Sequence, residues 1–159
     1  MIHYRFWRAA ATLAWVSLCL GSPAHAIGGY RPSVLAATSD NGAAVRFVEG
    51  GSALVQRALA DLGRDKFTAF SGPWCADAVS AWLASIGKPP LANRMAASAL
   101  AYGPHINSPV SGDLAVMRHH VGIVVEDRGG KVVIVSGNWS HRVAVSVVSR
   151  RTFLAFVHV

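Results

Sequence analysis

The stretch SGPWCADAVSAWLASIG, from Ser71 to Gly87, predicts a turn that leads into a helix, with Cys75 in the first helical turn. Ser71 or Gly72 can cap this helix, and Pro73 suits the first helical position because its missing N–H would be unpaired there. Gly87 is expected to end it. A thiol at a helix N-terminus meets unpaired backbone N–H groups and the positive end of the helix dipole, which favour the thiolate. The stretch therefore predicts a reactive thiol if the rest of the chain supplies a base.

The first 26 residues have the pattern of a secretory signal peptide. A positive start with Arg5 and Arg8 precedes an apolar run at 9–20, and Ala24-His25-Ala26 is an A-x-A cleavage signal. The run is too short to span a bilayer comfortably, since that takes roughly 20 residues. We expect residues 1–26 to be removed and the protein to be exported, to the periplasm or outside the cell, with no membrane span after cleavage. An uncleaved anchor is the alternative.

The mature chain would keep a single cysteine and a moderately basic charge. Cleavage after Ala26 removes Cys19, and one thiol cannot form an internal disulfide, so Cys75 is either reactive or buried as a small hydrophobe. Removing Arg5 and Arg8 leaves 13 of the 15 Lys and Arg residues against 8 Asp and Glu, a net charge of +5. This charge suits an anionic surface such as a cell wall, although solubility would also explain it. The chain has no run of Lys and Arg residues and no spacing typical of zinc ligands, so no nucleic-acid-binding pattern accompanies the charge.

The residues after the signal divide into a spacer and one domain. Residues 27–51 are rich in Gly, Ser, Ala, Asn and Pro, which predicts a linker or a partly ordered segment. Residues 52–159 predict helices first, at 52–62, 71–87 and 93–102, and then strands, at 114–117, 120–126, 131–138, 143–147 and 154–159. A loop at 104–112 and a hairpin turn at 127–130 complete the pattern. Helices followed by strands predict an α+β fold with helices packed on an antiparallel sheet of about five strands.

The strand hairpin places two polar residues where a catalytic pair would need them. His120 starts one strand and Asn138 ends the returning one, so both lie at the same end of the sheet. If the N-terminus of the cysteine helix points to this end, Cys75 meets them in a Cys-His-Asn arrangement of nucleophile, base and orienter. His120 would take the thiol proton to give a thiolate–imidazolium pair, and Asn138 would hold the ring. The backbone N–H of Cys75 could stabilise the oxyanion of an attacked amide.

Four motifs occur in one order: PWCADAVSAWL at 73–83, SGDLAVM at 111–117, HHVGIVV at 119–125 and VVIVSGNWSHRVAVSVV at 132–148. Together they resemble the CHAP family of cysteine, histidine-dependent amidohydrolases/peptidases, in the branch with a Pro-Trp-Cys nucleophile helix. The resemblance covers roughly residues 52–159. It implies a papain-like fold and cleavage of an amide bond in peptidoglycan, by an amidase or an endopeptidase. Carried over by position, Cys75 is the nucleophile, His120 the base and Asn138 the polar third member.

The chain departs from the family pattern at two positions. Some members carry Glu two residues before the Asn, and here Ser136 stands there, so the third role rests on Asn138 alone. The residue before the family's histidine is commonly Gly, and here it is His119. His120 is preferred as the base because the Val-Gly-Ile-Val pattern begins directly after it.

Each of these residues also has a structural interpretation. Cys75 could be an inert core thiol, since free cysteine is among the most buried residues. Trp74 and Trp139 flank two of the proposed catalytic residues, and either can line a substrate groove or fill the core. His119 is expected to be a solvated histidine at a strand edge.

A metal site is the other chemical alternative. His119 and His120 with Asp113 could suggest one, but adjacent strand residues point to opposite faces and seldom bind one ion. We expect no metal and no cofactor, and a structural turn at Gly112-Asp113. His105, His141 and His158 are expected to be surface or hydrogen-bonded histidines.

The function expected from these observations is a secreted peptidoglycan hydrolase, with stem peptides as substrates and a monomeric state. The alternatives are a catalytically silent wall-binding or adaptor domain of the same fold and a toxin-like wall hydrolase delivered to rival cells. The sequence does not distinguish an amidase from an endopeptidase, because both need the same thiol chemistry.

Overall fold

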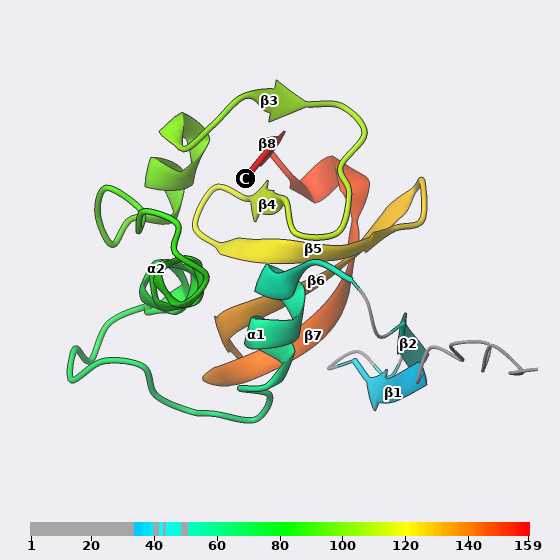
Figure 1. Cartoon of the computed structure of the whole chain (residues 1–159), viewed down its shortest axis with the longest axis horizontal. Coiled ribbons are helices and arrows are strands. Elements are labelled where there is room, and N and C mark those ends of the chain that lie inside the picture. Colours follow the sequence, from blue (N-terminus) through cyan, green and yellow to red (C-terminus); the bar gives the residue numbers. More distant parts are fainter. Residues whose placement is uncertain (1–33, 40–41, 43, 49–50) are drawn as a thin grey trace, which may run out of the picture. The chain divides into compact units, whose positions relative to one another are not determined.

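A computed structural model describes residues 34–39, 42, 44–48 and 51–159 (Figure 1). The expected signal peptide, residues 1–26, lies outside the described residues. The described chain combines α-helices, short 3-10 helices and antiparallel sheet, which confirms the α+β class. None of its helices has the length and apolar character needed to cross a membrane. The elements are β1 (Val34–Thr38), β2 (Ala44–Val48), α1 (Ala53–Leu59), α2 (Cys75–Ser85), η1 (Ala96–Ala101), β3 (His105–Ile106), β4 (Leu114–Val116), β5 (Val121–Asp127), β6 (Lys131–Trp139), β7 (Arg142–Ser149), η2 (Arg150–Thr152) and β8 (Ala155–Val157).

The segment 27–51, expected to be a linker or partly ordered, contains an antiparallel pair of strands. β1 and β2 run from the pair Val34 and Val48 to the pair Thr38 and Ala44. Gly42, at a φ of 79°, donates its N–H to the Ser39 carbonyl in the turn between them. Ser39 and Gly42, two of the residues that indicate a spacer, belong to this turn, and the strands come from the short runs VLAAT and AVRFV.

The main sheet has the strand order β3-β8-β4-β5-β6-β7, with every neighbouring pair antiparallel. Strands β4 to β8 are the five expected from the sequence. The sixth, β3, lies in the predicted loop at 104–112 and pairs only His105 and Ile106 with β8. Two residues are too few to produce an alternating pattern, so this strand could not be predicted from periodicity.

Helix α2 begins at Cys75, later than the predicted cap at Ser71 or Gly72 and the predicted first helical position at Pro73. Trp74 is the N-cap, with a φ of −120°, and its carbonyl accepts the N–H of Ala78. The indole of Trp74 is buried and stacks on Phe67 at 5.6 Å between ring centroids, so tertiary packing fixes this boundary. The predicted end is confirmed. Gly87 has a φ of 77°, and the next residue donates its N–H to the Leu83 carbonyl, which closes a Schellman motif.

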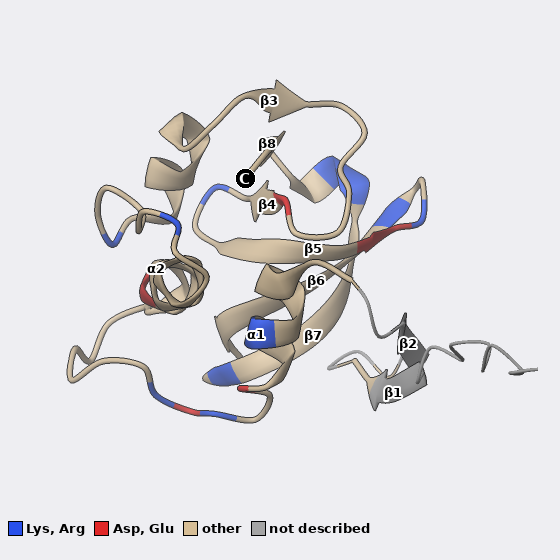
Figure 2. Cartoon of the chain, in the orientation of Figure 1, with Lys and Arg blue, Asp and Glu red and all other residues tan. Residues whose placement is uncertain are grey.

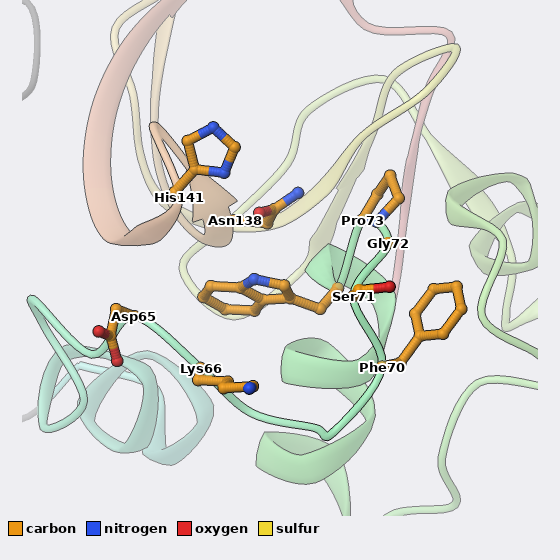
Figure 3. Close-up of a pocket in the computed structure, with 9 residues that line it drawn as sticks. Asp65, Lys66, Phe70, Ser71, Gly72, Pro73, Asn138 and His141 are labelled. Carbon is orange, nitrogen blue, oxygen red and sulfur yellow. The ribbon is translucent and has the colours of Figure 1, made fainter.

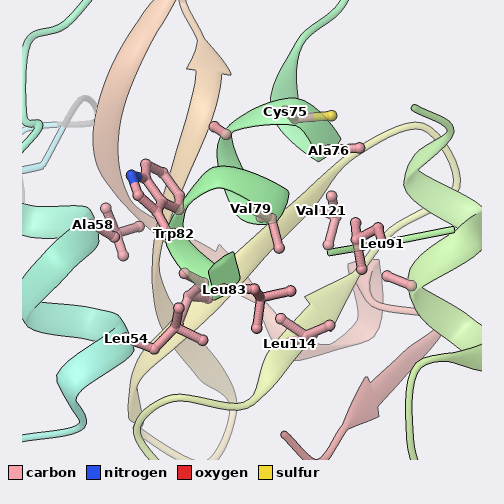
Figure 4. Packing of buried hydrophobic residues seen from close by; sticks show 14 of the residues in the cluster. Leu54, Ala58, Cys75, Ala76, Val79, Trp82, Leu83, Leu91, Leu114 and Val121 are labelled. Carbon is pink, nitrogen blue, oxygen red and sulfur yellow. The ribbon is translucent and has the colours of Figure 1, made fainter. Parts of the chain in front are cut away.

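The sheet is buried on both faces. On one face α1 and α2 pack against β5 and β6 (Figure 4), and the helix predicted at 93–102 is a 3-10 helix, η1, on the same side of the core. The other face carries a smaller apolar cluster, which Trp139 and Phe153 contact. The members of this second cluster are Ala115, Met117, Val124, Val132, Ile134 and Phe156.

Candidate active site

The candidate site lies at the end of the sheet where the pairing between β5 and β6 stops. At this end of the sheet the last paired residues are Ile123 and Val135. The hairpin between β4 and β5 continues one step further, because the His120 carbonyl accepts the N–H of Met117 at 2.8 Å. In the trans peptide unit from His120 to Val121 the N–H points opposite to the carbonyl, away from β4. The ladder therefore leaves this N–H without a partner from β6.

The sulfur of Cys75 is the hydrogen-bond partner of the Val121 N–H. It accepts a hydrogen bond from the backbone of Val121, and it also faces the N–H groups of Ala76 and of Cys75 itself. Figure 4 shows Cys75 at the N-terminal end of α2, with Val121 of β5 in the same cluster. Because the Val121 N–H belongs to the peptide bond with His120, a single peptide unit separates the sulfur from the backbone of the predicted base.

Gly137 lets α2 approach the sheet this closely. A Cβ atom at this position would lie 2.5 Å from the Cβ of Ala78 and 2.6 Å from Cζ3 of Trp74. The first turn of α2 therefore packs directly on the backbone of β6, with no side chain between them. This contact brings Cys75 to the end of β6 that carries Asn138.

Burial decides the protonation state of the thiol. Cys75 is only 3% exposed, and this burial raises the pKa of its thiol despite the N–H groups that favour the thiolate. The nearby carboxylate of Asp77 raises the pKa further. For the pKa of the thiol, burial thus outweighs the effect expected from the helix N-terminus alone.

The imidazole of His120 is affected by burial as well. Burial lowers its pKa from 6.5 to about 4, and Nε2 is a buried atom with no hydrogen-bond partner. The ring lies edge-on against Trp139, with centroids 5.1 Å apart and planes at 77°. The pKa shifts of both groups thus favour their uncharged forms, whereas the sequence predicts a thiolate–imidazolium pair.

A bulge redirects the end of β6. The β6–β7 register passes from Ser136 opposite Ala144 to Trp139 opposite Arg142, so β6 carries one extra residue. At this bulge Asn138 adopts a left-handed backbone conformation, with a φ of 58°. The bulge reverses the alternation of side chains and turns Trp139 towards the second cluster. Asn138 itself lines a pocket, so its expected contact with the far ring nitrogen is not formed here, since Nε2 has no partner.

The pocket has a volume of about 400 Å³ and adjoins the cysteine helix (Figure 3). Figure 3 shows Asn138 and His141 on its sheet side, residues 70–73 along the adjoining side next to Asn138, and Asp65 and Lys66 below. Trp74 lines it, as expected for a groove residue, whereas Trp139 is placed against His120. The full lining is Asp65, Lys66, Phe70, Ser71, Gly72, Pro73, Trp74, Asn138 and His141.

Sequence reasoning missed most of this lining. Residues 65–70 form a connection without regular structure, where no periodicity marks a site. One usable signal was the run Asn138-Trp139-Ser140-His141, since Asn and His tolerate the left-handed region that Asn138 and His141 adopt.

Other candidate residues have structural partners. Asp113 is buried, its carboxylate accepts the Val110 N–H at 2.7 Å, and His158 Nδ1 lies 2.8 Å from the other oxygen. This agrees with the expected structural turn. His105 Nε2 lies 2.8 Å from the Leu100 carbonyl. His119 is exposed, and among the described residues no group of three or more His, Cys, Asp or Glu is arranged to hold a metal ion.

Comparison with protein-family models finds no family that matches this chain, and a search of curated proteins finds no match. The resemblance of the four motifs to the CHAP family therefore stays a hypothesis.

Proposed function

We propose that this chain is an exported cysteine hydrolase with a papain-like fold, related to the CHAP family, that cleaves an amide bond in peptidoglycan as an amidase or an endopeptidase. One observation carries the proposal. The only cysteine of the expected mature chain accepts the Val121 N–H, one peptide unit from His120, at the N-terminus of a helix and beside a pocket. The motif resemblance supplies the substrate class.

Cys75 acts as the nucleophile and His120 as the base. As the sulfur attacks the carbonyl carbon, the thiol proton passes to the imidazole, so no ion pair is needed beforehand. The C–S bond forms, and the carbonyl oxygen becomes an oxyanion that the Cys75 N–H stabilises. His120 then protonates the leaving amine as the C–N bond breaks. Water, deprotonated by His120, releases the acyl group as a carboxylic acid and restores the thiol.

The pocket provides the place for the peptide. Trp74 lines the pocket and directly precedes the nucleophile, so the pocket adjoins the first turn of α2, although the buried Cys75 and His120 are not among its lining residues. Asp65, Lys66 and His141 add polar groups suited to the charged ends and side chains of a stem peptide. The third role proposed for Asn138 stays a prediction from the sequence, because Asn138 lines the pocket and the buried Nε2 of His120 has no hydrogen-bond partner.

The test is mass analysis of the muropeptides released from purified sacculi by the mature protein. We expect release by the wild type and none by Cys75→Ala or His120→Ala, because each variant lacks one member of the pair. His119→Ala is the matched control and should retain activity, since this neighbouring histidine is exposed on the turn. Undiminished digestion by Cys75→Ala, with the same products, would refute the proposal.

A second candidate is a wall-binding domain of the same fold without turnover. The burial of both groups favours it, because burial raises the pKa of Cys75 and lowers that of His120. In that case wild type and Cys75→Ala would bind sacculi equally, neither would release muropeptides, and Cys75 would react with iodoacetamide no faster than a small-molecule thiol at the same pH.

A further inference from the structure

A single guanidinium joins the first turn of α2 to the wall of the pocket. Arg94 lies on the connection between α2 and η1, and its Nε is 3.3 Å from Oδ1 of Asp77. Its Nη2 donates to Oγ1 of Thr68 at 3.4 Å, and its Cζ lies 4.7 Å from the ring centroid of Phe70. Arg94 therefore contacts the cysteine helix and the residues that lead into it at the same time.

The pocket wall holds this guanidinium in place. Phe70 lines the pocket (Figure 3), and a Cβ atom on Gly72 would lie 2.3 Å from Cε1 of its ring, so the ring rests against the backbone of the wall. A guanidinium over an aromatic face is attracted by the ring quadrupole. The side chain of Arg94 is 54% exposed, yet the ring and the Thr68 hydroxyl fix it where it meets Asp77.

Asp77 is the partner of Arg94 that acts on the proposed nucleophile. It stands two residues after Cys75 in the first turn of α2, and its negative charge raises the pKa of the Cys75 thiol. The side chain of Asp77 is 18% exposed, and its Oδ2 is buried and has no hydrogen-bond partner. Water therefore screens this carboxylate poorly, and the positive charge that lies against it is the guanidinium of Arg94.

The elements around α2 bring their other charges elsewhere. On α1, Arg57 is paired with Asp61 at 3.0 Å, and η1 has no charged residue. The charged residues of β5 and β6 lie at the hairpin that joins them, away from the site, and are Glu126, Asp127 and Lys131. The turn before β5 and the pocket add the remaining titratable groups, which are Arg118, His119, His120, Asp65, Lys66 and His141. Within the described part of the chain, Asp77 and Arg94 thus form the ion pair of the first turn of α2.

We propose that Arg94 is a positioning residue for the nucleophile: it pairs with Asp77 and offsets the negative charge that this carboxylate places beside the Cys75 sulfur. The inference rests on the proposed role of Cys75. As the thiol gives up its proton, negative charge develops on the sulfur, and an uncompensated carboxylate two residues away would oppose it. Arg94 reduces this opposition without contacting the sulfur or the substrate.

The experiment is the rate of alkylation of Cys75 by iodoacetamide in the folded mature protein, measured across the pH range in which a thiol titrates. The 13C NMR shift of the Cys75 Cβ gives the same titration without depending on access of a reagent. Arg94→Ala is compared with Arg94→Lys, which keeps the charge, and with Arg150→Ala. Arg150 is the matched control because its guanidinium also lies over a ring, that of Phe156, and pairs with a carboxylate, that of Asp127, but it belongs to η2.

Arg94→Ala should move both titrations to higher pH and slow the alkylation near neutral pH about threefold, the size expected for a partly exposed ion pair. Arg94→Lys should restore the wild-type profile, and Arg150→Ala should not change it. When Asp77→Asn is already present, Arg94→Ala should have no further effect, because the carboxylate charge is gone.

Two results would overturn the inference. Faster alkylation of Arg94→Ala at every pH would mean that Arg94 only holds the wall in place, since a loosened wall admits the reagent without changing the titration. Equal titrations of Cys75 in the wild type and in Arg94→Ala would mean that the ion pair has no effect on the sulfur. Neither readout uses a substrate, so this failure is distinct from a failure to release muropeptides.

Discussion

At the scale of single residues, the site depends on a competition between burial and hydrogen bonding. Three backbone N–H groups face the Cys75 sulfur, yet burial is the larger effect and raises the pKa of the thiol. For His120 no partner offsets the loss of water, and burial lowers its pKa. Both shifts favour the uncharged forms. In the proposed reaction these shifts favour transfer of the thiol proton to the imidazole during the attack.

The lowered pKa of His120 predicts acid sensitivity of the fold. The folded pKa of about 4 lies below the ordinary value of 6.5, so between these values the unfolded chain binds the proton more readily. The stabilising effect of a neutral His120 is present above pH 6.5 and is lost as the pH falls towards 4. Between pH 7 and pH 5 we expect the free energy of unfolding to fall by about 2 kcal/mol from this residue.

Urea unfolding at these two pH values measures the effect. His120→Leu should remove most of the pH-dependent loss, and His119→Leu, at the exposed neighbouring position, should not change it. Equal pH dependence in the wild type and His120→Leu would contradict the lowered pKa.

At the scale of elements, the contact between α2 and β6 holds the site together. Figure 1 shows α2 beside the sheet, and Gly137 is where its first turn meets the strand backbone. Trp74 and Ala78 leave no room there for a side chain. The position of the sulfur relative to Val121 is therefore set by backbone packing.

Gly137→Ala tests this contact. The added methyl would overlap Ala78 and Trp74, so we expect a loss of about 2 kcal/mol in the free energy of unfolding and slower alkylation of Cys75. Gly130→Ala is the control, since its Cβ would meet nothing within 4 Å. Denaturant unfolding compares the two, and equal stabilities would show that α2 does not rest on Gly137.

The elements also show which features can be predicted from a sequence. The end of α2 at Gly87 and the strands β4 to β8 follow from local chemistry, namely a residue tolerant of positive φ and alternating β-branched residues. The start of α2 does not, because the burial of Trp74 against Phe67 is a tertiary contact. The bulge at Asn138 and the pocket wall at 65–73 likewise depend on residues distant in the chain. The nearness of Cys75 to the backbone beside His120 could therefore be predicted, but the effect of burial on the two pKa values could not.

At the scale of the whole molecule, the positive charge is only partly free to act. Figure 2 shows basic residues at strand ends and in connections, several of them beside acidic ones. Arg94 pairs with Asp77, Arg128 with Glu126 and Arg150 with Asp127. These three ion pairs neutralise their charges locally. Attraction to an anionic wall therefore depends on the basic residues that remain in excess of the acidic ones.

Binding of the inactive Cys75→Ala protein to sacculi should therefore weaken with salt, since exposed charges are screened within about 10 Å at 0.1 M ionic strength. Lys66, on the pocket rim, should contribute more than Lys88, which follows α2 on the surface. We expect Lys66→Ala to reduce the bound fraction in a pelleting assay and Lys88→Ala to change it less. A bound fraction independent of salt would mean that the charge serves solubility alone.

The connection after α1 is clamped to the outer strand β7. Gly63 donates its N–H to the Val143 carbonyl at 2.9 Å, and the Val143 N–H returns to the Arg64 carbonyl at 2.7 Å. The clamp occupies backbone groups that a second molecule could otherwise pair with, and it anchors the chain just before the pocket wall. A substitution that released it would expose an aggregation-prone edge and loosen the pocket together, so insolubility and loss of substrate binding should appear as one defect.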